Sequence, residues 1–139
     1  MSSLEETLKS FKEDFDLFES GDEKLEYIFD LAKEHTTLPE EEKNDDTLVG
    51  CASPAWLVGE CKDGKVILRG EGTSEMAKGM MTLLLKIFNN RTPDEILNFD
   101  PSRLQELGII ELLSPVRQKS MDAFLQKVYG YAKKCKDSQ

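Results

Sequence analysis

The chain has 139 residues, of which 39% are hydrophobic and 32% are charged, an ordinary balance for a globular protein. Its formal net charge of −9 argues against binding to nucleic acid or to an anionic membrane surface. The length predicts one domain over residues 1–139, and no apolar run approaches the roughly 20 residues of a membrane span. Residues 1–15 have neither a basic start nor an apolar stretch, so we expect no secretory signal and a cytoplasmic location.

Two amphipathic helices are predicted first. Ser3 and Glu6 have the spacing of a capping box, and hydrophobic residues follow at intervals of three and four, so this helix should end near Gly21. Asp22 can cap the second helix. His35, near the end of that helix, is interpreted as a capping or solvated residue, because a cation suits a helix C-terminus.

An exposed connection and a hairpin are expected next. Residues 38–46, LPEEEKNDD, break the helical periodicity and are interpreted as solvated surface, with a docking face for a basic partner as the functional alternative. Residues 55–61 and 65–70 are short and rich in β-branched and aromatic side chains. Between them Asp63-Gly64 is typical of a tight turn with two positive φ angles, which predicts an antiparallel hairpin.

Helices return after the hairpin. The apolar run over residues 76–88 occupies most of a helix circumference, so it is predicted to be the central, mostly buried helix. The expected N-terminal caps of this helix and of the three that follow are Thr73 or Ser74, Thr92, Asp100 and Ser114. The sum is an α+β fold, in which N-terminal and C-terminal helices flank a small antiparallel sheet.

Several kinds of chemistry lack support. His35 is the single histidine, and the cysteines have no CxxC spacing, so we predict no metal site. Gly70-Glu71-Gly72 fits neither phosphate-binding glycine pattern, and no nucleophile-elbow sequence is present. No cofactor is therefore expected.

The three cysteines are an odd number in a chain without a predicted export signal, which disfavours a disulfide framework. Cys61 lies in a predicted strand and is interpreted as structural, and Cys135 lies in the charged C-terminus and is interpreted as incidental. Cys51 follows Gly50 and precedes Ala52 and Ser53, and such small neighbours permit close approach of another molecule. A packed, chemically inert Cys51 remains the alternative.

Residues 38–56, LPEEEKNDDTLVGCASPAW, resemble a segment of the SufE/CsdE family of sulfur acceptors, in which Gly50, Cys51, Ser53 and Trp56 fill the fixed positions. The resemblance extends from about Asp22 to Ala132. It continues through Lys78-Gly79, TPDEILNFD at residues 92–100 and LSPVR at residues 113–117. The family's acidic position after the hairpin is matched by Glu71 or Glu75.

The resemblance implies a SufE/NifU-like fold and a sulfur carrier for iron–sulfur cluster assembly. Cys51 would take persulfide sulfur from a PLP-dependent cysteine desulfurase of the SufS or CsdA type, stimulate that enzyme and relay sulfur to cluster scaffold proteins. Gly50, Ser53 and Arg117 would support the site. Such an accessory protein needs no metal or cofactor of its own and has no independent turnover. The alternative is a non-catalytic, acidic interaction module with a packed cysteine.

Overall fold

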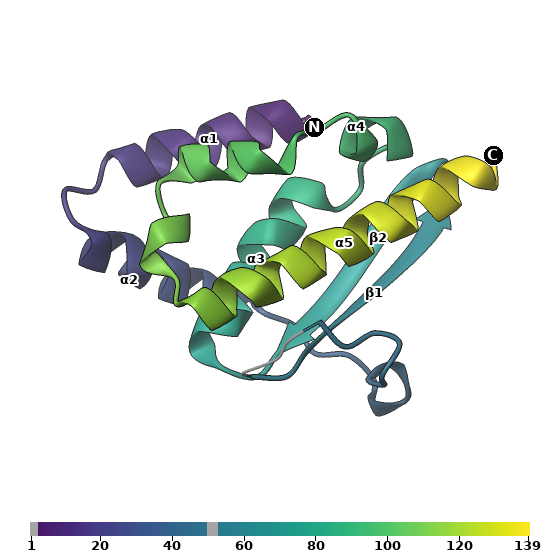
Figure 1. The fold of residues 1–139 in the computed structure, drawn as a ribbon, viewed down its shortest axis with the longest axis horizontal. Coiled ribbons are helices and arrows are strands. Elements are labelled where there is room, and N and C mark those ends of the chain that lie inside the picture. The colour runs from purple at the N-terminus through teal and green to yellow at the C-terminus, as the bar shows by residue number, and fades with distance from the viewer. Residues whose placement is uncertain (1–2, 50–52) are drawn as a thin grey trace.

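The computed structural model describes residues 3–49 and 53–139 and combines helices with one antiparallel hairpin, which confirms the predicted α+β class (Figure 1). In chain order the elements are α1 (Leu4–Asp16), α2 (Gly21–Leu31), η1 (Ala32–Glu34), η2 (Glu40–Glu42), β1 (Ala55–Lys62), β2 (Lys65–Gly72), α3 (Glu75–Phe88), α4 (Pro93–Leu97), η3 (Pro101–Leu107), η4 (Ile110–Leu112) and α5 (Pro115–Asp137). No helix in the described part of the chain is long and apolar enough to cross a membrane.

Most helix starts follow the local capping signals. The predicted caps Ser3, Thr92, Asp100 and Ser114 all accept a backbone N–H from the turn that follows, and Ser74 is the cap of α3. One predicted cap was wrong: the Ser20 hydroxyl, not Asp22, accepts the Glu23 N–H at 3.3 Å, so α2 begins at Gly21. Asp22 instead lies in the first turn, where a carboxylate suits the positive end of the helix dipole.

The hairpin packs one face against α3 and α5. Asp63 and Gly64 have φ of 53° and 77°, which confirms the predicted turn, and Ala55 pairs with Gly72 at the other end. Leu57 and Leu68 are buried on the helical face. Glycines let the helices approach this face closely. The ring of Tyr131 lies directly over Gly59, where a Cβ would come within 2.4 Å, and its O–H donates to the Leu57 carbonyl at 3.0 Å.

Residues 38–47, which we call the acidic arm, contact the opposite face of the hairpin at the end away from the turn. Because side chains alternate along a strand, Trp56, Arg69 and Glu71 point away from the helices. Arg69 forms a two-pronged ion pair with Glu42 of the arm, and the Lys43 ammonium lies 5.3 Å from the centre of the Trp56 ring. Most residues of the arm are exposed, as its composition predicted, but Leu38, Glu42 and Lys43 are fixed to the sheet by their contacts with β1 and β2.

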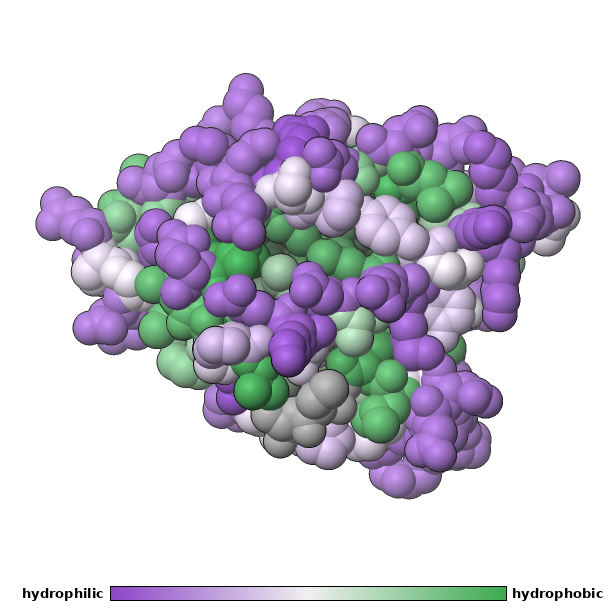
Figure 2. Space-filling view, viewed as in Figure 1, coloured by the Kyte–Doolittle hydropathy of each residue, from purple (hydrophilic) through white to green (hydrophobic). Residues whose placement is uncertain are grey.

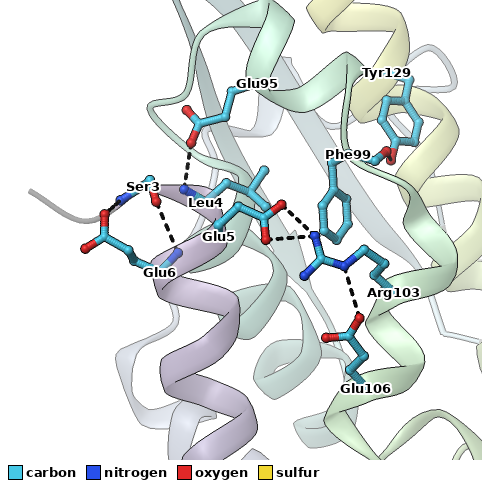
Figure 3. A network of polar contacts seen from close by, with 9 residues as sticks. All are labelled: Ser3, Leu4, Glu5, Glu6, Glu95, Phe99, Arg103, Glu106 and Tyr129. Atoms are coloured by element: carbon cyan, nitrogen blue, oxygen red, sulfur yellow. Dashed lines mark hydrogen bonds and ion pairs between the residues drawn. The ribbon is translucent and has the colours of Figure 1, made fainter.

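Polar contacts fasten the start of α1 to α4 and η3 (Figure 3). The Leu4 N–H donates to Glu95 at 2.7 Å. Arg103 bridges Glu5 and Glu106, with nitrogen–oxygen distances of 2.6 and 3.0 Å. These contacts lie on the side of the molecule away from the acidic arm (Figure 1), so they support the fold and not the region around residue 51.

A disulfide joins Cys61 and Cys135, which overturns the expectation of free thiols. Their Cα atoms lie 5.2 Å apart and 74 residues separate them in sequence. The bond ties the turn end of β1 to the last turns of α5. Cys135 has only 2% of its surface exposed and α5 continues to Asp137, so this cysteine is not in a frayed end. No spacing pattern predicts such a pair, because the contact arises from packing two distant elements.

Helices α2 and α3 meet at Gly79, where an added Cβ would lie 2.2 Å from the Ile28 carbonyl oxygen. A clash with backbone cannot be relieved by a rotamer change. We expect Gly79→Ala to lower the free energy of unfolding by about 1–3 kcal/mol, the usual cost of overpacking. Gly130→Ala in α5 is the matched control, since nothing lies within 4 Å of its Cβ position. Gly130→Ala should raise the free energy of unfolding by about 0.5–1 kcal/mol, because alanine favours a helix more than glycine does. Urea denaturation measures both, and equal effects would contradict the close contact.

Loss of the disulfide should lower stability. Cys61→Ser/Cys135→Ser is expected to reduce the free energy of unfolding by about 2–4 kcal/mol, because the cross-link no longer restricts the unfolded chain. Urea denaturation of the wild type with and without dithiothreitol should give a similar difference. The double variant is the control and should not respond to the reductant; a response would mean that the stabilisation lies elsewhere.

Candidate functional site

The segments on either side of Cys51 are paired with each other by backbone hydrogen bonds. Residues 47–49 run antiparallel to the start of β1: the Val49 N–H donates to the Ala55 carbonyl and the Leu57 N–H donates to the Thr47 carbonyl, both at 2.8 Å. Residues 50–54 therefore connect two paired segments. The predicted site residues Gly50 and Cys51 lie outside the described residues, so the site is defined by its flanks.

The acidic arm holds the first flank of this loop. The Thr47 hydroxyl donates to the Glu42 carbonyl at 2.8 Å, and Lys127 of α5 donates to the Asp46 carbonyl. The arm is in turn fixed to β2 by the buried Glu71, which bonds to Leu38 and Lys43. Together these bonds determine where the chain enters the loop.

Glu71 is a carboxylate with only 9% of its residue surface exposed. It accepts the Leu38 N–H at 2.7 Å and the Lys43 ammonium at 3.3 Å. The hydrogen bond from Leu38, with a further contribution from Lys43, lowers the pKa of Glu71 below its usual 4.5, although burial opposes this. Glu71 is therefore ionised at neutral pH. Glu75, the other match to the family's acidic position, is exposed and pairs with Lys78 at 3.8 Å.

The second flank meets α3 and α5 through hydroxyl groups. The Oγ atoms of Ser53 and Ser74 are 3.3 Å apart, and Nη1 of Arg117 donates to the Ser74 Oγ at 3.4 Å. The Thr73 hydroxyl donates to the Pro54 carbonyl at 2.8 Å. The structure thus brings the predicted residues Ser53 and Arg117 together, and it joins them through Ser74.

Ser74 stands out in the sequence only as one of two possible helix caps. The signal that could have found it is the hairpin register. Ala55 pairs with Gly72, so the residues just after β2 must lie beside the residues just before β1. A hydroxyl at the cap of α3 therefore falls next to the loop, which capping patterns alone do not reveal.

An apolar cavity of about 70 Å³ opens between α3 and α5 against both flanks of the loop. Small-molecule pockets typically have volumes of about 300–1,000 Å³, so this cavity suits a side chain or a few atoms and not a large cofactor. Arg117 and Ser53 are among its few polar groups. The lining residues are Val49, Ser53, Ala55, Met76, Ala77, Met80, Met81, Leu84, Leu113, Arg117, Ser120, Met121 and Phe124.

His35 was expected to cap a helix or to be solvated; it is the C-cap residue of η1, and its ring is partly buried beside β2. Its Nε2 accepts the Gly72 N–H at 3.1 Å, which requires an unprotonated nitrogen. Partial burial, followed by the charge of Lys78, lowers the pKa of His35 below 6.5. The ring thus serves as a neutral acceptor at the end of β2. Within residues 3–49 and 53–139, no three His, Cys, Asp or Glu side chains gather as metal ligands.

Comparisons with known proteins give a consistent result. The SufE family model, described as an Fe-S metabolism associated domain, matches residues 9–132. An uncharacterized SufE-like protein of Rhizobium meliloti is 26% identical over 138 residues, covering 95% of this chain and 96% of the relative.

A likeness in fold accompanies the likeness in sequence. The solution structure of a hypothetical protein from Thermus thermophilus matches with a TM-score of 0.75 at 20% identity, covering 93% of this chain and 95% of that one. Because the family model covers most of the chain, the protein belongs to the SufE family and has a role in iron–sulfur metabolism and sulfur transfer.

Proposed function

We propose that Cys51 accepts sulfane sulfur from a PLP-dependent cysteine desulfurase, stimulates that enzyme and passes the sulfur on to cluster scaffold proteins. The Cys51 thiolate attacks the terminal sulfur of the enzyme's cysteine persulfide. The sulfur–sulfur bond of the enzyme breaks, its cysteine leaves as a thiolate, and Cys51 carries the persulfide. No electron acceptor is consumed. Residues 1–139 form one domain in this proposal. That domain carries sulfur and catalyses no reaction by itself.

The observation that carries the proposal is the pair of fixed flanks, residues 47–49 and 53–57, on either side of Cys51 in a member of the SufE family. Backbone bonds join the flanks to each other, and contacts from the acidic arm, from residues 73–74 and from α5 hold them in place. Persulfide exchange needs a thiol that a partner can approach, and it needs no metal, no cofactor and no base supplied by the acceptor. The proposed exchange therefore requires only the thiol of Cys51 from this protein.

The cavity beside the loop supports a sheltering role. A persulfide is readily oxidised or reduced in water, and the cavity offers an apolar volume of a few atoms with a single guanidinium, that of Arg117. Four methionines line it, and thioethers are polarizable groups that adapt to irregular contents. We propose that the sulfur on Cys51 is held there between the two transfers.

The surroundings of the loop suit contact with a protein partner. Leu48 beside the loop and Val116 in the first turn of α5 have 39% and 44% of their surface exposed, unlike most large hydrophobic residues of this chain. Figure 2 shows hydrophobic surface near the start of α5 and along the lower edge of the molecule, within a mostly hydrophilic face. We propose that the desulfurase docks over this region.

Cys51→Ser tests the function directly. After incubation with a desulfurase, PLP and cysteine, we expect the intact mass of the wild type to increase by one or more sulfur atoms, and reductant should remove the gain. The Cys51→Ser variant should gain none and still bind the enzyme. The control is Cys61→Ser/Cys135→Ser, which should accept sulfur as the wild type does. Binding without sulfur gain in the wild type would instead favour a non-catalytic interaction module.

The hold of Glu71 on the acidic arm should depend on pH. Because the pKa of Glu71 is lowered in the fold, its contribution to stability is present above pH 4.5 and is lost as the pH falls through the folded pKa. Glu71→Gln should lower the free energy of unfolding by about 1 kcal/mol at pH 7, the difference between a charged and a neutral hydrogen bond. The difference from wild type should shrink in acid.

Urea denaturation between pH 7 and pH 3 gives both quantities. Glu75→Gln is the matched control, because Glu75 is an exposed glutamate whose ion pair contributes little. A constant difference between Glu71→Gln and wild type over the whole pH range would contradict the role of the Glu71 charge.

A further inference from the structure

The hydrogen bonds of the Ser74 hydroxyl fix the direction of its proton. A serine hydroxyl has one proton to donate and two lone pairs that accept. The Ser74 Oγ already accepts the Ala77 N–H at 3.1 Å and Nη1 of Arg117 at 3.4 Å, and neither of these groups can act as an acceptor. The contact with Ser53 at 3.3 Å must therefore use the Ser74 proton, although the distance alone allows either direction.

We propose that Ser74 is a positioning residue for sulfur transfer, whose hydroxyl fixes the exit of the Cys51 loop relative to α3 and Arg117. The inference rests on the proposed function, since it assigns a residue to the same site. Ser74 is itself held in place, because it caps a helix of 14 residues at the centre of the fold. A donor anchored in this way costs less entropy to orient than one on a mobile loop.

The direction of the bond has a chemical consequence. Since Ser53 is the acceptor from Ser74, its own proton can be donated to a further acceptor. Ser53 follows Cys51 by two residues in sequence, so the acceptor that we propose for this proton is the sulfur carried on Cys51. Arg117 and the positive end of the α3 dipole both polarise the Ser74 hydroxyl, and hydrogen bonds in series strengthen one another. The chain of donors runs from Arg117 through Ser74 to Ser53.

The test must separate positioning from helix capping. Ser74→Gly removes the hydroxyl but keeps an acceptable cap, since glycine in place of serine costs only a few tenths of a kcal/mol. Ser74→Thr retains the hydroxyl. Ser53→Ala removes the same hydrogen bond from the loop side and leaves the cap intact. Thr92→Gly is the matched control, because Thr92 caps α4 in the same way.

Single-turnover transfer from a persulfidated cysteine desulfurase is the first readout. At saturating concentration, Ser74→Gly and Ser53→Ala should each slow transfer by roughly two- to tenfold, the effect of one hydrogen bond between uncharged groups. Affinity for the enzyme should not change. The double variant should be no slower than the slower single variant, because both remove one interaction. Ser74→Thr and Thr92→Gly should transfer at the wild-type rate.

The second readout needs no enzyme. The second quantity is the rate at which N-ethylmaleimide modifies Cys51, mapped by peptide mass. Relative to the wild type, Ser74→Gly and Ser53→Ala should change this rate by the same factor. Ser74→Thr should have the wild-type rate. Wild-type rates in both assays for Ser74→Gly, or effects that multiply in the double variant, would overturn the proposal. If even the wild type accepts no sulfur, the proposed function fails, and the modification rates alone then decide whether Ser74 positions the loop.

Discussion

A hairpin of two strands is not stable by itself, and the rest of this structure follows from the need to cover both of its faces. Helices α3 and α5 bury one face, and they come close enough because glycines such as Gly59 leave room for their side chains. The acidic arm contacts the other face, at the end away from the turn, through Glu71 and Arg69. Because the arm runs directly into the loop of residues 50–54, the contacts that stabilise the sheet also set the position of the loop.

The site is assembled from segments that are distant in sequence. The loop supplies Ser53, α3 supplies Ser74, and α5 supplies Arg117. None of these groups needs to move a proton for persulfide exchange. What the fold provides is placement: a thiol-bearing loop with fixed flanks, an apolar cavity beside it and a line of donors. In this proposal the desulfurase catalyses the chemistry, and the carrier positions the thiol that accepts the sulfur.

Local signals in the sequence predicted the fold well, because caps and turns depend on a few adjacent residues. Ser3, Thr92 and the turn at Asp63-Gly64 are examples. Contacts between distant segments were not predictable in this way. The charges of the acidic arm indicated an exposed connection, and most of the arm is exposed, but they did not predict that Glu42 and Lys43 pair with Arg69 and Glu71 on β2. At the site, the family resemblance selected Ser53 and Arg117, which do lie near each other. Ser74 was missed because its place beside the loop depends on the strand register.

The disulfide between Cys61 and Cys135 bears on how long a carried sulfur survives. A persulfide is destroyed when a second thiol attacks its inner sulfur, which forms a disulfide and expels hydrogen sulfide. In this chain the two other cysteines are already bonded to each other. Cys61 also stands six positions along β1 from Ala55, which is roughly 20 Å at about 3.3 Å per residue. While Cys61 and Cys135 are bonded to each other, the molecule contains no second thiol that could attack a persulfide on Cys51. Transfer of the sulfur therefore depends on the next protein.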